Sequence, residues 1–231
     1  MMRIGIVAAL PGELRPLVRE WPRTDHVCIG QVGSVQCFAA CEGIGAAAAT
    51  RSFAAIRAAA DGLDAIISYG FAGALSCGVK PPGVHAVAEV VDARTGERFV
   101  TDTQRHGPGA PLRLVTLDHV AGSGEKRPLA ERYQATLVDM EAATIGRLAR
   151  AHGLPFLCFK GISDGYTDEL PDFNRFITPA GQLRTTAFAS HALLHPRSWG
   201  ALLTLGRNSR AAAEALARTL PDTLRGSTLI F

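Results

Sequence analysis

The stretch LVDMEAATIGRLARAHG, residues 137–153, places two acids, Asp139 and Glu141, at the front of a predicted helix. Glu141 shares one helical face with Ile145 and Leu148, which we expect to point into the core. The helix dipole favours an acid in the first turn by about 0.3–1 kcal/mol, and this accounts for Asp139. A carboxylate on the core-facing stripe loses hydration, so Glu141 needs a partner. A ligand rich in hydroxyl groups would satisfy Glu141, and a purely structural role is the alternative.

Segments typical of strands and helices alternate along the chain, which predicts an α/β protein. Strands are expected at residues 3–10, 26–41 (two strands joined at a glycine turn), 63–70, 83–93, 112–118 and 154–160, and helices at 45–60, 137–153, 180–194 and 198–220. A turn is expected at 71–75, a hairpin tip or loop at 94–111 and a loop at 161–176. We predict a single domain over residues 1–231: a three-layer α/β/α arrangement with a mixed, mostly parallel central sheet.

The composition excludes several classes of protein. Hydrophobic residues make up 47% of the chain and charged residues 19%, so a large core is expected and extensive disorder is not. The net charge of +3, without a basic run, argues against binding of nucleic acid. No apolar run approaches the roughly 20 residues that span a bilayer. The apolar C-terminal residues 226–231 are compatible with a packed tail or with a surface contact.

The start of the chain and its cysteines predict a cytoplasmic protein. An acid and a proline follow the first apolar residues too early for a signal peptide. The five cysteines show no CxxC spacing and are expected to be reduced thiols, mostly in or beside apolar strands.

Two glycine-rich stretches suggest nucleotide binding only at first sight. Gly43, Gly45 and Ala48 approach the dinucleotide fingerprint, but the next strand lacks the acid that would hold a ribose, and Asp64 lies at its wrong end. A tight strand-to-helix turn explains the glycines better. Residues 122–127 lack the spacing of a phosphate-binding P-loop. The seven histidines show no ligand spacing either, so neither a cofactor nor a metal site is predicted.

Acids follow three of the predicted strands. Glu13 comes after the first strand, Asp139 and Glu141 follow residues 135–138, and Ser163 and Asp164 follow the last strand. In an open α/β sheet, ligands bind beyond the carboxyl ends of the parallel strands. Each acid alone is explained by a helix start or a turn. The three together predict a binding site.

These residues lie in motifs that resemble the purine nucleoside phosphorylase/nucleosidase superfamily. The motifs are GIVAALPGE (5–13), GIGAAAA (43–49), YGFAGAL (69–75), LVDMEAATI (137–145) and FKGISD (159–164), and the resemblance runs from about residue 3 to residue 164. Their pattern is most similar to the methylthioadenosine/S-adenosylhomocysteine nucleosidases. Residues 195–212 look more like the hopanoid-associated phosphorylases, which are thought to remove adenine from adenosylhopane. The resemblance implies the nucleoside phosphorylase-like fold and no cofactor.

The resemblance also implies a role for each acid. Glu141 would bind the ribose hydroxyls with Met140 packed under the sugar, Asp164 would protonate N7 of the purine, and Glu13 would activate water. Cleavage of an N-glycosidic bond builds positive charge on the sugar and negative charge on the base, so an acid near the base and carboxylates near the ribose suit it. The base would lie against Val120 and Ala121, with Ser163 nearby and His119 as a weaker candidate. Gly70, Phe71 and Ala72 would border the nucleophile and the 5′ group.

The chain departs from the family where phosphorylases hold phosphate. Phe71 replaces the usual Ser or Thr, and the preceding Arg is absent, since Ile66, Ile67 and Ser68 stand there. Lys160 replaces the Arg that nucleosidases carry before the ISD motif. We therefore predict that the protein hydrolyses a purine nucleoside with a modified 5′ group, and we expect the purine to be adenine. Phosphorolysis with Arg15 as a phosphate ligand, an oxidoreductase using residues 43–48 and a non-catalytic nucleoside-binding protein are the alternatives. The resemblance further implies a homodimer or a higher homo-oligomer.

Overall fold

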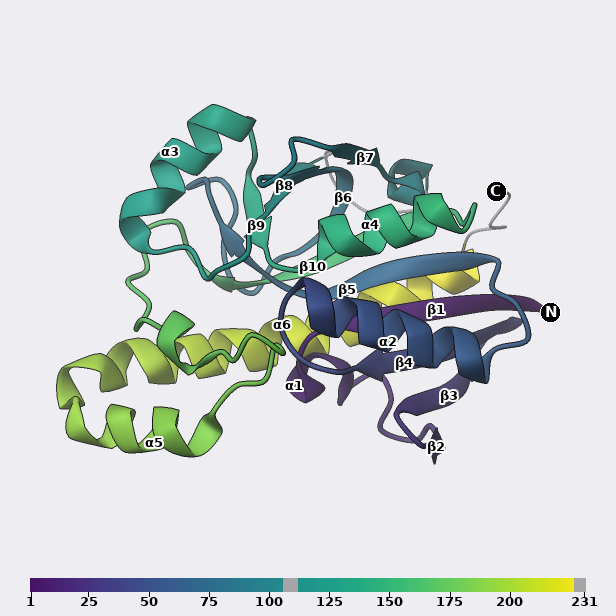
Figure 1. Cartoon of the computed structure of the whole chain (residues 1–231), viewed down its shortest axis with the longest axis horizontal. Helices are drawn as coiled ribbons and strands as arrows, with labels where there is room; N and C mark the ends of the chain where they lie inside the picture. The colour runs from purple at the N-terminus through teal and green to yellow at the C-terminus, as the bar shows by residue number, and fades with distance from the viewer. Residues whose placement is uncertain (106–111, 227–231) are drawn as a thin grey trace.

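The computed structural model describes residues 1–105 and 112–226, and its helices and strands alternate as the sequence predicts (Figure 1). The strands are β1 (Met2–Ala8), β2 (Arg23–Thr24), β3 (Val27–Val32), β4 (Val35–Cys41), β5 (Ala65–Ala74), β6 (Val84–Asp92), β7 (Arg98–Val100), β8 (Leu112–Thr116), β9 (Leu137–Asp139) and β10 (Phe156–Asp164). The helices are α1 (Pro11–Leu14), α2 (Ala46–Ala59), α3 (Ser123–Tyr133), α4 (Ala142–Ala151), α5 (Thr185–Leu194) and α6 (Trp199–Gly226). Short 3₁₀ turns are η1 (Asp102–Arg105), η2 (Asn174–Phe176) and η3 (Pro196–Ser198).

All these strands join one mixed sheet, in the order β10-β6-β8-β9-β5-β1-β4-β3-β2 with β7 beside β6. Strand β5 pairs with β1, β9 and β10, so β5, β10, β6, β8 and β9 form a closed ring of pairings. Parallel pairings join β1–β4, β1–β5, β5–β10, β6–β8 and β8–β9, and antiparallel pairings are as numerous. The predicted mixed sheet is confirmed, and most of its aligned residue pairs are parallel.

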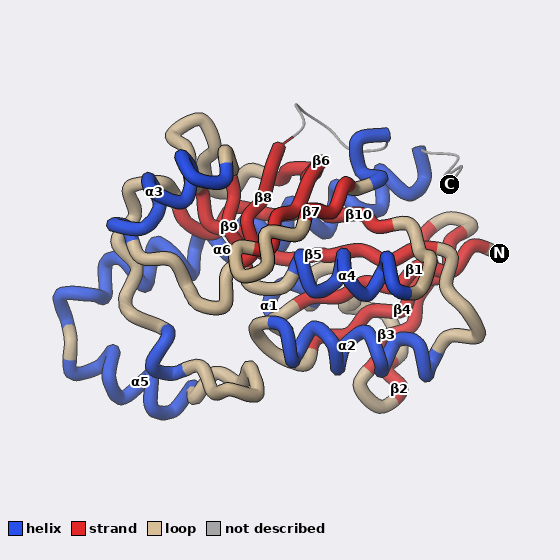
Figure 2. Tube along the Cα trace, turned by 45° about the horizontal axis from the view of Figure 1, so that its top comes forward, coloured by secondary structure: helices blue, strands red, loops and turns tan. Residues whose placement is uncertain are grey.

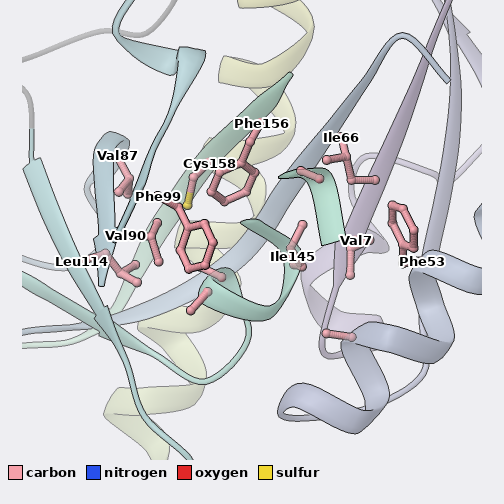
Figure 3. Packing of buried hydrophobic residues seen from close by; sticks show 14 of the residues in the cluster. Val7, Phe53, Ile66, Val87, Val90, Phe99, Leu114, Ile145, Phe156 and Cys158 are labelled. Carbon is pink, nitrogen blue, oxygen red and sulfur yellow. The ribbon is translucent and has the colours of Figure 1, made fainter. Parts of the chain in front are cut away.

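Helices cover both faces of the sheet. Helices α2 and α4 lie on one face and α1 and α6 on the other (Figure 2). Successive residues of β5 alternate between them, since Ile66 belongs to the core under α2 and α4 while Ile67 packs with α6. Figure 3 shows the first core, where Phe53 and Ile145 lie on either side of Ile66 and Val7. The predicted three-layer α/β fold is therefore confirmed.

Several local expectations were wrong. Residues 161–164, expected as the start of a loop, continue β10, so Ser163 and Asp164 end that strand instead of following it. Residues 71–74 continue β5 instead of forming a turn, because antiparallel pairing with β9 extends the strand. Helix α3 was not predicted. The hairpin expected within residues 94–111 is present as the turn between β6 and β7, and η1 follows it. Residues 106–111 and residues 227–231 of the apolar tail lie outside the described part of the chain. Asp139 ends strand β9, and Glu141 precedes α4, so neither acid lies in the first helical turn.

Two sequence expectations concern thiols and membranes. All five cysteines are free, and Cys37 and Cys158 are buried in strands. In the part of the chain that the structure describes, no helix is both long and apolar enough to cross a bilayer.

We predict that Leu216→Ala destabilises the protein by about 2–5 kcal/mol, because the side chain is fully buried where α6 packs on the sheet. Leu203→Ala on the same helix is the control, since Leu203 is 75% exposed, and we expect a change within about 0.5 kcal/mol. Urea unfolding followed by circular dichroism measures both. Equal midpoints for the two variants would show that α6 does not contribute to the core.

Candidate active site

A cavity of about 400 Å³ lies beside the last residues of β1, β5, β9 and β10. The residues that line it are Ala9, Leu10, Glu13, Ile44, Phe71, Ala72, Gly73, His119, Val120, Ala121, Val138, Asp139, Met140, Glu141, Ser163, Asp164, Leu170, Phe173, Ile177, Leu183, Phe188, Leu202, Leu205, Gly206 and Ser209. Strand pairing brings the polar ones together, because Gly73 is opposite both Asp164 and Val138. Of the predicted site residues, all but Gly70 line this cavity.

Glu13 is buried at the base of the cavity, and backbone N–H groups hold its carboxylate. Oε2 accepts hydrogen bonds from Ala9 N at 2.7 Å and Leu10 N at 2.8 Å, and Oε1 accepts one from Phe71 N at 2.8 Å. A carboxylate accepts about four hydrogen bonds, so one acceptor position on Oε1 is left for a ligand or water. Burial raises the pKa of Glu13 above its usual value, despite these hydrogen bonds and the charge of Lys160.

Gly70 makes room for Glu13 instead of lining the cavity. Its φ of +145° is one that side-chain-bearing residues rarely adopt, and a Cβ there would lie 2.6 Å from Oε1 of Glu13. The next residue, Phe71, donates its N–H to the same oxygen. The sequence YGF thus serves to bring strand β5 against the Glu13 carboxylate.

Asp139 and Lys160 form an ion pair inside the protein. Nζ of Lys160 lies 2.8 Å from Oδ2 of Asp139, and the two side chains are 2% and 1% exposed. Asp139 also accepts hydrogen bonds from Thr116 Oγ1 at 2.7 Å and from Ala142 N at 2.9 Å. Burial by itself would lower the pKa of Lys160, but the surrounding groups, with the charge of Asp139 first among them, together raise that pKa. Lys160 therefore stays cationic, directly behind the cavity.

Glu141 is buried and lies between the cavity and the start of α2. Its Oε1 accepts a hydrogen bond from Gly45 N at 2.6 Å, while no group in residues 1–105 or 112–226 donates to Oε2. Burial, together with the negative charge of Asp139, raises the pKa of Glu141 to about 8. The backbone of Gly45 is therefore one of the partners that the buried Glu141 carboxyl group needs. Gly45 has a φ of +83° and lies in the expected strand-to-helix turn. The second oxygen is available to a ligand.

Asp164 closes the opposite side of the polar region. Its Oδ1 accepts a hydrogen bond from Ser163 Oγ at 2.8 Å, and its Oδ2 lies 2.7 Å from Nζ of Lys126. Lys126, on α3, is only 1% exposed and also donates to the Gly165 carbonyl. Sequence reasoning missed Lys126, because the polar residues around it give no sign that its side chain is buried.

Val120 carries a pair of backbone groups that a side chain already binds. Its N–H donates to Oδ1 of Asn174 at 2.7 Å, and its carbonyl accepts from Nδ2 of Asn174 at 3.0 Å. Asn174 was not predicted, since it lies in η2 within the expected loop. His119, nearby, pairs with Asp118 and Glu125 on its outer side. Those contacts, with Asp118 first, raise the pKa of His119.

The remainder of the cavity wall is apolar and comes from the last third of the chain. Leu170, Phe173, Ile177 and Leu183 line it from the segment before α5, Phe188 from α5, and Leu202 and Leu205 from α6. Phe71 and Met140 face the same space from the strand ends. No motif in the sequence singled out this wall, because its residues are spread over the segment before α5 and over two helices.

The lining contains no Lys or Arg side chain among the described residues, and Arg15 is exposed outside it. In the same part of the chain no group of three His, Cys, Asp or Glu side chains is arranged to hold a metal ion. The site is therefore a row of carboxylates with its two lysines buried behind them.

A family model described as the phosphorylase superfamily matches residues 3–114 and 95–193. The chain belongs to the phosphorylase superfamily. The match includes every acid of the cavity and agrees with the enzyme class that the sequence predicts. No curated protein sequence matches the chain significantly.

Solved structures of this superfamily share the fold at low sequence identity. The 5′-methylthioadenosine/S-adenosyl homocysteine nucleosidase of Helicobacter pylori superimposes with a TM-score of 0.71 at 16% identity, covering 98% of this chain and 99% of that one. Futalosine hydrolase of the same organism gives 0.71 at 16% identity, covering 98% of each chain. The 5′-methylthioadenosine nucleosidase of Arabidopsis thaliana gives 0.74 at 17% identity, covering 100% and 98%.

We predict that Glu141 makes stability fall as pH rises from about 5 to 8. The native state holds the proton of Glu141 up to about pH 8, whereas the unfolded chain loses it near 4.5. In that window the native state binds more protons, so the free energy of unfolding decreases with pH. Urea unfolding at several pH values should show a shallower decrease for Glu141→Gln. Parallel curves for the two proteins would contradict the raised pKa.

Proposed function

We propose that the protein hydrolyses the N-glycosidic bond of a purine nucleoside that carries an apolar 5′ group. The observation that carries this proposal is the set of Glu13, Glu141 and Asp164 around one cavity, each from a different element and each buried. Such a set addresses both charges that develop when the bond breaks. The proposal is supported by the similar folds of the Helicobacter pylori 5′-methylthioadenosine/S-adenosyl homocysteine nucleosidase and futalosine hydrolase.

Asp164 is the proposed acid. As the bond from the sugar to the base breaks, electrons move into the purine, and a proton delivered to N7 converts the base into a neutral leaving group. Ser163 fixes one oxygen of the carboxyl group. The Lys126 ammonium, 2.7 Å from the other oxygen, favours the carboxylate, so we propose that Asp164 takes up a proton from solvent when the nucleoside binds and becomes the carboxylate again after it gives that proton to N7.

Glu13 is the proposed base. Its raised pKa brings it closer to neutral pH, where a general base is most effective. Three backbone N–H groups fix the carboxylate, and the remaining acceptor position on Oε1 would orient a water molecule toward the sugar carbon. The same contacts show that Glu13 also organises the start of α1, so its structural role is larger than simple capping.

Glu141 and Met140 are the proposed ribose contacts. Oε2 of Glu141 would accept a hydrogen bond from a ribose hydroxyl, since Gly45 already occupies Oε1. Lys160 contributes positive charge from behind, through its ion pair with Asp139. Met140 offers an apolar surface beside the sugar face.

Adenine is the proposed base because of the pattern at Val120. The Asn174 amide presents one donor and one acceptor to the backbone of Val120. The N6 and N1 atoms of adenine present the same donor and acceptor, whereas hypoxanthine presents an acceptor and a donor in their place. An adenine ring could therefore replace the Asn174 amide on Val120, with Ala121 and Ser163 beside it.

Water is the proposed nucleophile. Phosphate would enter a cavity lined by Glu13, Asp139, Glu141 and Asp164, with no Lys or Arg side chain in the described lining to bind it. The cations of the site, Lys126 and Lys160, are each paired with an acid and buried. Phosphorolysis stays the alternative that the assay below tests.

We predict that the protein releases adenine and free sugar in phosphate-free buffer, at a rate that added phosphate does not increase. Asp164→Asn should lower kcat by roughly 10²–10⁴-fold, because the amide has no proton to give to N7. Asp61→Asn, on the exposed surface, is the control and should keep wild-type activity. The measurement is base release followed by chromatography.

Strict dependence on phosphate, with ribose-1-phosphate as product, would replace hydrolysis by phosphorolysis. Binding of adenine nucleosides without release of base from any of them would identify a non-catalytic nucleoside-binding protein.

We predict that kcat/KM rises along a series of 5′-alkylthio-adenosines, by up to roughly fourfold for each added CH₂ that the apolar wall covers, since burial of a CH₂ is worth about 0.8 kcal/mol. Leu202→Ser, in the wall, should flatten the series. Leu203→Ser, its exposed neighbour, is the matched control. Equal kcat/KM for methyl and octyl compounds would exclude an apolar 5′ site.

A further inference from the structure

Helices α5 and α6 form a hairpin that extends beyond the sheet. Figure 1 shows α5 and the first half of α6 side by side at the lower left, away from the strands, and Figure 2 shows the same separation. Trp199 fastens the turn between them, because its Nε1 donates to the Ala192 carbonyl at 2.7 Å. The second half of α6, by contrast, packs under the sheet through Leu216, Leu220 and Leu224.

The tip of this hairpin is unusually apolar for a surface. Leu193, Leu194 and Leu203 are 70%, 77% and 75% exposed, and Trp199 is 46% exposed. Six large hydrophobic side chains are exposed in residues 1–105 and 112–226, and four of the six belong to this tip. Scattered apolar side chains need no explanation, but a group at one turn indicates a contact surface.

The same hairpin is strongly basic. Residues 184–210 contain Arg184, Arg197, Arg207 and Arg210, as well as two histidines, and no acid. All four arginines are exposed. Four positive charges in 27 residues exceed the net charge of +3 of the whole chain. Only Arg210 has an acidic partner in the described structure, Glu214, one turn further along α6.

We propose that the α5–α6 tip binds the surface of an anionic lipid bilayer. Leucines and a tryptophan at a turn, with Arg197 beside them and further arginines along the two helices, match the boundary between acyl chains and headgroups. Tryptophan favours that boundary because its ring is apolar and its N–H is polar. The leucines enter the apolar side, while the arginines remain among the phosphates.

Two other occupants fit the tip less well. A second copy of the chain in a two-fold interface would place the same four arginines against each other without an acid to offset them. Nucleic acid would pair with the arginines but would leave the leucines exposed, since base stacking uses flat rings. The expected homo-oligomer stays a prediction for another face of the protein.

Vesicle sedimentation of the full-length protein tests the proposal. The probes are vesicles of phosphatidylcholine alone and vesicles with three parts phosphatidylcholine and one part phosphatidylglycerol. We expect binding to the anionic vesicles, weaker binding at high salt, and little binding to phosphatidylcholine, because each arginine near an anionic surface adds to the attraction.

Matched variants separate the tip from the general charge of the protein. Arg197→Glu should reduce the partition coefficient by roughly ten- to thirtyfold, as expected for the reversal of one charge at the surface. Arg218→Glu makes the same change on α6, about 30 Å away from the turn, and should alter the partition coefficient less than about twofold. Leu193→Ser combined with Leu194→Ser should also lose binding while the melting temperature stays unchanged.

Three outcomes overturn the proposal. They are equal binding of Arg197→Glu and Arg218→Glu, full binding by the leucine variant, and no binding of the wild type to anionic vesicles. A smaller oligomer of the leucine variant in sedimentation velocity, without vesicle binding, would assign the tip to a second copy. None of these assays contains a nucleoside, so their failure is distinct from failure of the proposed hydrolase activity.

Discussion

The ion pair between Asp139 and Lys160 is the interaction on which the candidate site depends. It joins the end of β9 to the middle of β10, and Asp139 also accepts the N–H of Ala142 at the start of α4. Three elements that meet at the cavity are thus held by one carboxylate. Loss of one member of such a buried pair typically costs about 3–5 kcal/mol, because the other charge stays buried without a partner. The position of Glu141, two residues after Asp139, follows from this arrangement.

The charges of the site are arranged in two layers. Acids line the cavity, and Lys126 and Lys160 lie behind them, each paired with an acid. Each lysine lowers the cost of keeping a carboxylate away from water without itself being presented to a ligand. Glu141, which has only a backbone N–H as a partner, instead has its pKa raised to about 8. The layering explains how several acids can share a cavity of about 400 Å³.

Much of the sheet was predictable from the sequence, because strands such as residues 27–32 and 35–41 are short, largely apolar runs with a glycine turn between them. The acids at the strand ends were predictable for the same reason. Helix α3 was not, since it is polar, contains Pro128 and buries only Lys126. A lysine in a polar stretch gives no sign that it will be buried against an acid 38 residues away. The ring of pairings through β5, β9 and β10 depends on contacts between distant residues, which local patterns do not encode.

The last third of the chain adds an apolar wall to the cavity, whereas the strand ends supply its acids. Phe188, Leu202 and Leu205 of the α5–α6 hairpin face the cavity, and Leu193, Leu194 and Leu203 of the same hairpin face outward. Leu202 and Leu203 are adjacent in α6 and lie about 100° apart around the helix, so one lines the cavity while the other faces solvent. Apolar residues on both sides leave the projecting part of the hairpin with little core of its own, and α5 buries none of its residues. An element of this kind is stabilised when something apolar covers its outer or its inner side. Occupancy of the cavity and contact at the tip would therefore act on the same two helices.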